Sequence, residues 1–291
     1  MDGILNIFKN KGMSSFDVVR KVKQTVHMKK VGHTGTLDPM AEGVLPVAVG
    51  KGTKIIDYIM DSDKEYKVEF KLGIKTDTYD LEGKVINEYD TSNITENQVR
   101  DTIESFVGEY YQVPPMYSAL KQNGVRLYEL ARKGIEVERK GRKINIKSIY
   151  AINIDLPYVT MTVTCGKGTY IRSLCYDIGE KLKCGAVMTK LKRSRTSIFE
   201  EENSINIEEL NGENIESNII SIEDALKFYP KFIVKNSFTK LLINGVKVFD
   251  KRLTDMKCDK DVLYRVYDDN DFFIGLGKQD EQGFKIVKLL V

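Results

Sequence analysis

The sequence is poor in the side chains from which metal centres and disulfide frameworks are built. Its 291 residues include four cysteines and two histidines. No two cysteines form a Cys-x-x-Cys pair, and neither histidine lies near a cysteine in the chain. We therefore expect no structural zinc site and no disulfide framework, and a reducing cytoplasm is the simplest setting for such a chain.

Long apolar segments are also missing. No apolar run approaches the roughly 18 residues of a membrane-spanning helix, and the first residues lack the basic segment and apolar core of a secretory signal. The hydrophobic content of 42% and the charged content of 30% are typical of a soluble globular protein. The sequence thus predicts a cytoplasmic protein of one or two domains that has no membrane partner.

The net charge is only +3, so the overall charge does not indicate a nucleic-acid partner. The distribution of charge is more informative. Residues 181–199 carry six basic side chains and no acidic one, whereas residues 200–226 carry nine acidic side chains and no basic one. The basic stretch is either a surface that follows a phosphate backbone or a solvated helix face, and charge alone does not separate the two. The acidic stretch would repel a polyanion and should face away from one.

Glycine and proline are concentrated in one segment, residues 30–46. Such a segment is neither a regular helix nor a regular strand. From His33 to Asp38 it holds an imidazole, two threonine hydroxyls and a carboxylate. It leads into the apolar run 44–49, and loops anchored by a buried element often carry catalytic or binding residues. The alternative is a polar connector in which Asp38-Pro39 only starts a turn.

The periodicity of the apolar residues predicts an α+β protein. Alternating charged and apolar residues over 65–72 indicate a half-buried strand with Tyr66 on its apolar face. Two serines should start a helix near residue 16, and Thr95 to Gln98 form a capping box for a helix that should end at Gly108. The other expected features are strands over 4–8, 143–155 and 158–165, a polar loop over 73–83, and an extended lead-in to a helix over 114–121.

A glycine-rich turn, residues 166–169, connects a strand to a helix. Its spacing does not fit a phosphate-binding loop, so we do not expect a nucleotide triphosphate site or a phosphotransferase. Arg172 lies near the start of that helix and off its apolar face. Near the C-terminus, short strands are expected over 262–267, 272–277 and 284–289. We therefore divide the chain into a main domain, residues 1–230, and a small β-rich domain, residues 231–291.

The segment Gly32–Leu45, followed by Gly52-Thr53-Lys54, resembles the signature of the bacterial tRNA pseudouridine-55 synthases, the TruB family. The similarity covers residues 1–199 well and the rest loosely. Asn10 and Ser197-Ile198 depart from the family, which usually has Pro and Gly-Pro at these places. Further motifs similar to those of the family are Lys9-x-x-Gly12, Lys64-Glu65-Tyr66, Pro114–Lys121 and Gly168–Leu174.

The resemblance implies roles for individual residues. The catalytic residues would be Asp38, its partner Arg172 and the active-site tyrosine Tyr66. The substrate-binding residues would be His33 near the flipped nucleotides, Tyr170 lining the pocket, Asp80 supporting the arginine, and Lys9 in the first motif.

Two expectations follow for the electrostatics of such a site. Arg172 should keep Asp38 ionised by lowering the pKa of its carboxyl group. Tyr66 should stack on the target base, or should also relay the C5 proton, with Arg172 as the nearest charge to assist its hydroxyl.

The resemblance further implies a pseudouridine synthase fold, α+β with a large mixed sheet and flanking helices, plus a small C-terminal domain similar to the PUA domain. The implied function is isomerisation of uridine 55 in the T-arm of tRNA to pseudouridine, by a monomer that needs neither a cofactor nor a metal. The alternative is a non-catalytic tRNA-binding or tRNA-folding protein on the same scaffold. The presence of Asp38, Tyr66 and Arg172 together favours the enzyme, because a pure binding protein needs none of them.

Overall fold

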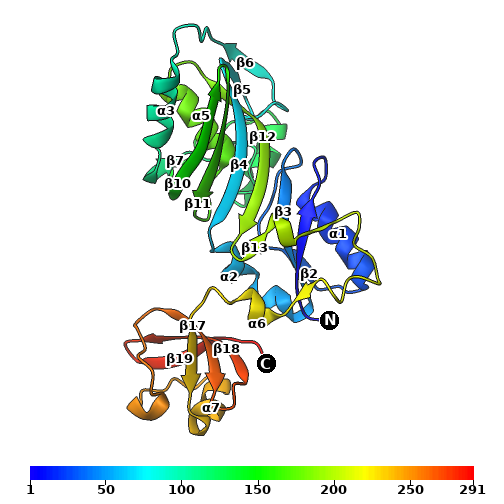
Figure 1. Cartoon of the computed structure of the whole chain (residues 1–291), viewed down its shortest axis with the longest axis vertical. Coiled ribbons are helices and arrows are strands. Elements are labelled where there is room, and N and C mark those ends of the chain that lie inside the picture. Colours follow the sequence, from blue (N-terminus) through cyan, green and yellow to red (C-terminus); the bar gives the residue numbers. More distant parts are fainter.

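A computed structural model describes residues 1–291, and it places the strands in one large sheet, one small sheet and two hairpins (Figure 1). The large sheet has 11 strands and is mixed, and its main path runs β14-β1-β3-β12-β4-β11-β10-β7. The α+β prediction with a large mixed sheet is therefore confirmed. The strands of this sheet are β1 (Gly3–Lys9), β2 (Val31–His33), β3 (Glu42–Val49), β4 (Lys64–Leu72), β7 (Gly108–Gln112), β10 (Arg142–Asp155), β11 (Tyr158–Cys165), β12 (Ala186–Thr196), β13 (Phe199–Glu200), β14 (Ile205–Asn206) and β15 (Ile219–Ile220).

The helices are short. The longest, α1, has 12 residues, and no helix combines the length and the apolar character of a membrane span. The α-helices are α1 (Ser15–Val26), α2 (Ile56–Met60), α3 (Glu96–Glu104), α4 (Leu127–Arg132), α5 (Ile171–Lys181), α6 (Ile222–Ala225) and α7 (Asn236–Ile243). The 3-10 helices are η1 (Gly50–Ile55), η2 (Glu201–Asn203) and η3 (Lys251–Leu253), and the hairpins are β5 (Ile74–Thr76) with β6 (Val85–Glu88) and β8 (Lys121–Gln122) with β9 (Val125–Arg126).

Strand β12 joins the two halves of the large sheet. It pairs antiparallel with β4 and parallel with the start of β3. The register places Arg193 of β12 opposite both Tyr66 of β4 and Gly43 of β3. Gly43 has φ +110°, and a Cβ atom there would overlap the Arg193 backbone, so only glycine fits this crossing. The close approach brings the segment before β3, which includes Asp38, to the centre of the sheet.

The alternation predicted for β4 is present and gives the main core one of its walls. The side chains of Tyr66, Val68, Phe70 and Leu72 are buried, and helices α1, α3 and α5 supply apolar side chains to the same core. In Figure 1 helix α5 lies behind strands β10, β11 and β4, and helix α3 lies along their left edge. Helix α5 packs on β12 and β4, which positions it over the centre of the sheet.

Both predicted helix starts are confirmed, but several local predictions were wrong. Capping boxes start α1 at Ser14 and α3 at Thr95. Helix α3 ends at Glu104, and Gly108, with φ +107°, begins β7 instead of ending the helix.

Three other segments also differ from the predictions. Residues 114–120 are irregular and lead into the β8–β9 hairpin, and not directly into a helix; α4 follows the hairpin. The hairpin forms because Asn123 and Gly124 both take positive φ in a tight turn. The polar loop over 73–83 includes β5, which pairs with β6. The basic stretch 181–199 is mainly strand β12, so it is not a helix face.

The C-terminal residues form a separate four-stranded sheet in the order β16-β17-β18-β19. Its core includes Phe232, Val266 and Phe284 and is distinct from the main core. Leu276 and Leu290 face the other way and pack with Ile4 and other residues of the main body. The strands are β16 (Lys231–Val234), β17 (Leu263–Asp268), β18 (Phe273–Asp280) and β19 (Gly283–Leu289).

Candidate active site

The backbone of Asp38 makes a turn, while its side chain is left free to form an ion pair. The amide of Ala41 donates to the carbonyl of Asp38 at 3.0 Å, so residues 38–41 form a β-turn with Pro39 at its second position. The turn interpretation of Asp38-Pro39 is therefore correct, and it does not exclude a functional carboxylate. The amide of Gly12 donates to the carbonyl of Pro39 at 2.8 Å and ties this turn to the loop before α1.

Two buried side chains brace the loop around Asp38. The Ser15 hydroxyl accepts from the amide of Leu37 at 2.8 Å and donates to its carbonyl at 3.0 Å. The ammonium group of Lys9 donates to the carbonyls of Ala41 at 2.5 Å, Met13 at 2.8 Å and Asn10 at 3.1 Å.

Lys9 therefore has a different place from the one implied by the resemblance. Its side chain is fully buried, and an ammonium group has only three donors, all of which serve backbone carbonyls. Burial lowers the pKa of Lys9 to about 8, although Asp38 acts in the opposite direction. The side chain holds the Asp38 loop to β1, and it offers no free donor to a substrate.

Arg172, at the start of α5, is the centre of the charge network. Its Nε atom lies 2.9 Å from Oδ2 of Asp38, and its Nη1 atom lies 3.2 Å from Oδ2 of Asp80. Nη1 also donates to the carbonyl of Thr78 at 3.1 Å, and Nη2 donates to that of Tyr117 at 2.9 Å. The guanidinium group thus joins three separate segments of the chain to α5 and fixes the orientation of Asp38.

Burial distinguishes the members of this network. The side chains of Arg172 and Asp80 are 6% and 4% exposed, whereas that of Asp38 is 34% exposed. The second oxygen of Asp80, Oδ1, accepts from the Thr78 hydroxyl at 2.5 Å and from the amide of Glu82 at 3.1 Å. Asp80 therefore faces the arginine and its own loop, and Asp38 is the carboxylate that a ligand can reach.

The net pKa of Asp38 is raised above its ordinary value, although Arg172 lowers it as expected. Burial is the largest cause, and the nearby charge of Asp80 adds to it. Arg172 and Lys9 act in the opposite direction but do not outweigh burial. The arginine thus limits the rise in pKa, and it holds a carboxylate that has lost part of its hydration.

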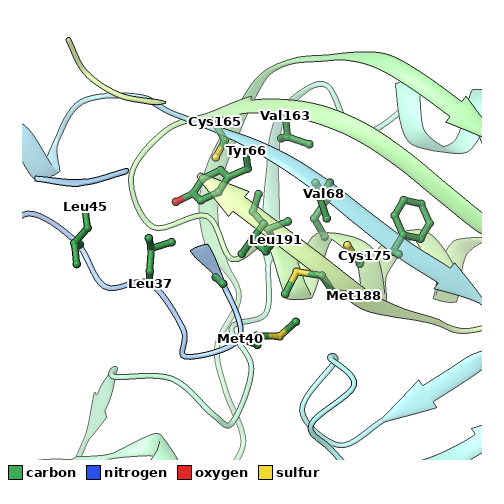
Figure 2. Packing of buried hydrophobic residues seen from close by; sticks show 14 of the residues in the cluster. Leu37, Met40, Leu45, Tyr66, Val68, Val163, Cys165, Cys175, Met188 and Leu191 are labelled. Atoms are coloured by element: carbon green, nitrogen blue, oxygen red, sulfur yellow. The ribbon is translucent and has the colours of Figure 1, made fainter. Parts of the chain in front are cut away.

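Tyr66 lies on the core face of β4, and Figure 2 shows its hydroxyl directed toward the side where Leu37 and Leu45 lie. Burial raises the pKa of the Tyr66 hydroxyl, and the adjacent positive charge of Arg193 lowers it. Arg193, and not Arg172 as expected, is therefore the cation whose charge lowers the pKa of this hydroxyl.

Local hydrogen bonds fix both Tyr170 and His33. The backbone of Tyr170 is held by the Gln112 side chain, which accepts from its amide at 2.8 Å and donates to its carbonyl at 3.1 Å. Burial raises the pKa of Tyr170, and the charge of Asp38 contributes to the rise. His33 ends β2, its Nδ1 atom accepts from the amide of Gly35 at 3.2 Å, and burial lowers its pKa.

Sequence reasoning missed Arg193 as an individual residue. It was counted with the other basic residues of 181–199, but its side chain is 1% exposed, so it cannot follow a phosphate backbone. The signal was the alternation within β12, which points Leu191 and Arg193 inward, opposite Val68 and Tyr66. By contrast, the Lys190 side chain is 74% exposed, so the basic stretch is not a single surface.

A cavity of about 410 Å³ lies beside the site but is not its centre. Met40, Leu191 and Lys192 line it, whereas Asp38, Tyr66 and Arg172 do not. No group of three His, Cys, Asp or Glu side chains is arranged to hold a metal ion.

The fold places the chain among the pseudouridine synthases. The structure is similar to a crystal structure of a Cbf5-Nop10-Gar1 complex, with a TM-score of 0.76, 25% identity, and coverage of 99% of this chain and 85% of that chain. Family models for the N-terminal domain of TruB family pseudouridylate synthases and for the C-terminal domain of tRNA pseudouridylate synthase B match residues 23–171 and 172–227.

Curated relatives agree over the whole length. Proteins named tRNA pseudouridine synthase B from Clostridium perfringens strain 13 and Clostridium tetani are 60% and 57% identical. The alignments cover 100% of this chain and 99% and 100% of those proteins. The chain belongs to the TruB family of pseudouridylate synthases, and it is an isomerase that converts uridine in RNA to pseudouridine.

Proposed function

We propose that this enzyme converts uridine 55 in the T-arm of tRNA to pseudouridine, and that Asp38 is the residue that acts on the reacting nucleotide. Relatives named tRNA pseudouridine synthase B, 43% to 60% identical over almost their whole length, support tRNA as the substrate. The observation that carries the role of Asp38 is its combination of partial exposure and fixed orientation. Asp38 is the open carboxylate of a network whose other two members are buried.

The reaction needs a carboxylate but no redox group. The N1–C1′ bond of the nucleotide breaks, a C5–C1′ bond forms, the C5 proton leaves, and N1 gains a proton, so the atoms and electrons balance within the nucleotide. Asp38 serves as the nucleophile, either at the sugar carbon or at the ring. Arg172 orients this carboxylate, and Asp80 holds Arg172 in place. Tyr66 and Tyr170 line the place of the base, and His33 lies toward the neighbouring nucleotides.

The target base must leave the stack of the folded T-loop to reach Asp38, which costs a few kcal/mol of stacking and pairing energy. Contacts outside the reaction centre have to supply that energy. We propose that residues 231–291 are a PUA-like RNA-binding domain and residues 1–230 the catalytic domain, because the second sheet has its own core. The enzyme would act as a monomer, which light scattering tests directly.

The function is tested by single turnover on unmodified tRNA, with pseudouridine mapped by position. The wild-type protein should modify position 55 and should leave a tRNA with cytidine at that position unmodified. Asp38→Asn should form no pseudouridine while its tRNA affinity stays within several-fold of wild type. Asp61→Asn is the matched control, because Asp61 pairs only with the exposed Lys167 on the surface. Turnover by Asp38→Asn would overturn the role of Asp38, and a different modified position would overturn the substrate site.

The C-terminal domain is tested by truncation after residue 230. Binding of tRNA should weaken more than the single-turnover rate falls. The unfolding temperature of the truncated protein must be measured in parallel, because Leu276 and Leu290 pack on the main body. A truncated protein that folds, binds normally and fails in chemistry would contradict this division.

A further inference from the structure

Arg193 is a buried cation without an anionic partner. Its side chain is 1% exposed and is among the largest fully buried side chains of the chain. The ion pairs of the structure, which include those of its strand neighbours Lys192 and Arg195, do not include Arg193. Burying an uncompensated charge is costly, and such groups are retained where the charge has a task.

The hydrogen bonds of Arg193 hold both sides of the Asp38 loop. Its Nε atom donates to the carbonyl of Val44 at 2.7 Å, and its Nη2 atom donates to the carbonyl of Gly35 at 3.2 Å. Gly35 precedes Asp38, and Val44 follows it in β3. A single planar group therefore spans the loop from one end to the other, which a flexible ammonium group cannot do in the same way.

The same side chain lies next to Tyr66. Arg193 and Tyr66 are directly opposite each other on the antiparallel strands β12 and β4. Side chains that are opposite each other in an antiparallel pair lie on the same face of the sheet and are in contact range. The positive charge acts on the Tyr66 hydroxyl, whose pKa it lowers against the effect of burial.

We propose that Arg193 is a positioning residue that couples Tyr66 to the Asp38 loop and stabilises the phenolate form of Tyr66 during proton transfer. The phenolate takes the C5 proton of the rearranged base and returns it to N1, so no net proton is gained or lost. Arg193 touches neither the base nor the sugar, and its effect passes through Tyr66. The inference rests on the proposed function, because it assigns a base to that reaction.

The pH profile of the single-turnover rate separates this role from a purely structural one. With Tyr66 as the base, the rate rises with pH until the hydroxyl is ionised. Arg193→Gln removes the charge, so the rising limb should move to higher pH by about one unit, with about a tenfold lower rate at pH 7. Arg193→Lys keeps a charge and should leave the limb close to its wild-type position, while the rate falls because the lost fork no longer aligns the Tyr66 hydroxyl with the Asp38 loop.

The second measurement is a double-mutant cycle. In a Tyr66→Phe background, Arg193→Gln should slow the reaction by no more than about twofold, because the hydroxyl through which Arg193 acts is gone. Binding of tRNA should change little in all of these variants. Arg195→Gln is the matched control, since Arg195 lies on the same strand, is 31% exposed and pairs with Glu65, and its rate and pH profile should equal those of wild type.

Two outcomes would overturn the coupling: an unshifted limb in Arg193→Gln, and an equal loss of rate with and without the Tyr66 hydroxyl. If Arg193→Gln fails to fold, the cycle is run with Arg193→Lys, whose loss should likewise disappear in the Tyr66→Phe background. Asp38→Asn distinguishes a failure of the proposed function from a failure of this inference. Pseudouridine formation by Asp38→Asn contradicts the proposed function. If Asp38→Asn is inactive but Arg193→Gln slows the reaction equally in the wild-type and Tyr66→Phe backgrounds, only this inference is contradicted.

Discussion

The candidate active site and the C-terminal sheet use the same kinds of ion pair in opposite surroundings. At the site, Arg172 and Asp80 meet at 3.2 Å with side chains that are 6% and 4% exposed. In the C-terminal sheet, Lys260 and Glu281 meet at 2.9 Å with side chains that are 55% and 83% exposed. The distances are similar, so the difference in energy comes from the solvent.

Water decides what each pair contributes. A surface pair is worth about 0–1 kcal/mol, because solvent screens the charges and two long side chains lose freedom. Breaking a buried pair by removing one partner costs about 3–5 kcal/mol, because the remaining charge stays buried. The site is therefore the region where a small chemical change should have a large effect, and the C-terminal sheet is the region where a comparable change should be tolerated.

The largest effect should come from Arg172→Lys. The substitution keeps the charge but loses the planar fork that binds Asp38, Asp80 and two carbonyls at once. We expect the single-turnover rate to fall by about 10²-fold or more, since a misplaced Asp38 loses its alignment with the nucleotide. Arg252→Lys, in the C-terminal domain, is the control and should be neutral because that side chain is 82% exposed. A near-normal rate in Arg172→Lys would mean that the fork does not orient Asp38.

A smaller effect should come from Asp80→Asn. Arg172 would keep Asp38 as its anionic partner, so we expect a loss of about 1–3 kcal/mol in the free energy of unfolding, measured in urea. The substitution also removes a negative charge that raises the pKa of Asp38. An acidic limb of the rate profile that reports Asp38 should therefore move to lower pH. A limb that stays in place would show that it does not belong to Asp38.

The site shows which parts of this organisation a sequence can predict. Strand β4 and the capping boxes of α1 and α3 could be predicted because alternation and capping depend on neighbouring residues. The meeting of Asp38 with Arg172 came from the family resemblance, since no local pattern joins the two. Lys9 was placed with the substrate because its motif does not reveal that all its donors serve backbone carbonyls.

Arg193 could not be predicted because its role depends on register. Its bond to Val44 joins residues 149 positions apart in the sequence, and a one-residue slip of β12 would place it outside. In the C-terminal sheet β17, β18 and β19 could be predicted, since turns separate them, whereas β16 was missed. The packing of Leu276 and Leu290 on the main body could not, because it depends on how two sheets meet.

Asp177, on the helix that carries Arg172, is partly buried, between the buried Asp80 and the exposed Glu281. Burial raises the pKa of its carboxyl group from 3.8 to about 7, and the Tyr110 hydroxyl, 3.3 Å away, acts in the opposite direction. Between about pH 4 and 7 the folded state holds this proton more tightly than the unfolded state, so the contribution of Asp177 to stability is lost as the pH rises.

The free energy of unfolding of Asp177→Asn should therefore rise relative to that of wild type as the pH increases from 4.5 to 8, by about 1–3 kcal/mol in total. The change is measured by urea unfolding of both proteins at several pH values. Asp101→Asn, on the exposed side of α3, should show no such dependence on pH. A constant difference between wild type and Asp177→Asn across this range would mean that the carboxyl group is ionised throughout.

The smallest effect should come from Glu281→Gln, which breaks the exposed pair with Lys260. Both groups keep most of their hydration, so the lost attraction is largely replaced by water, and the freed side chains regain rotamer entropy. We expect the free energy of unfolding to change by less than about 0.5 kcal/mol, and any difference to shrink further at 1 M salt, where the Debye length is about 3 Å. Urea unfolding of Glu281→Gln and Asp80→Asn at low and high salt measures the loss from the exposed pair and from the buried pair in one experiment. If Glu281→Gln costs as much as Asp80→Asn, burial does not separate the two regions, and the charges of the C-terminal sheet form a network whose strength the individual distances do not reveal.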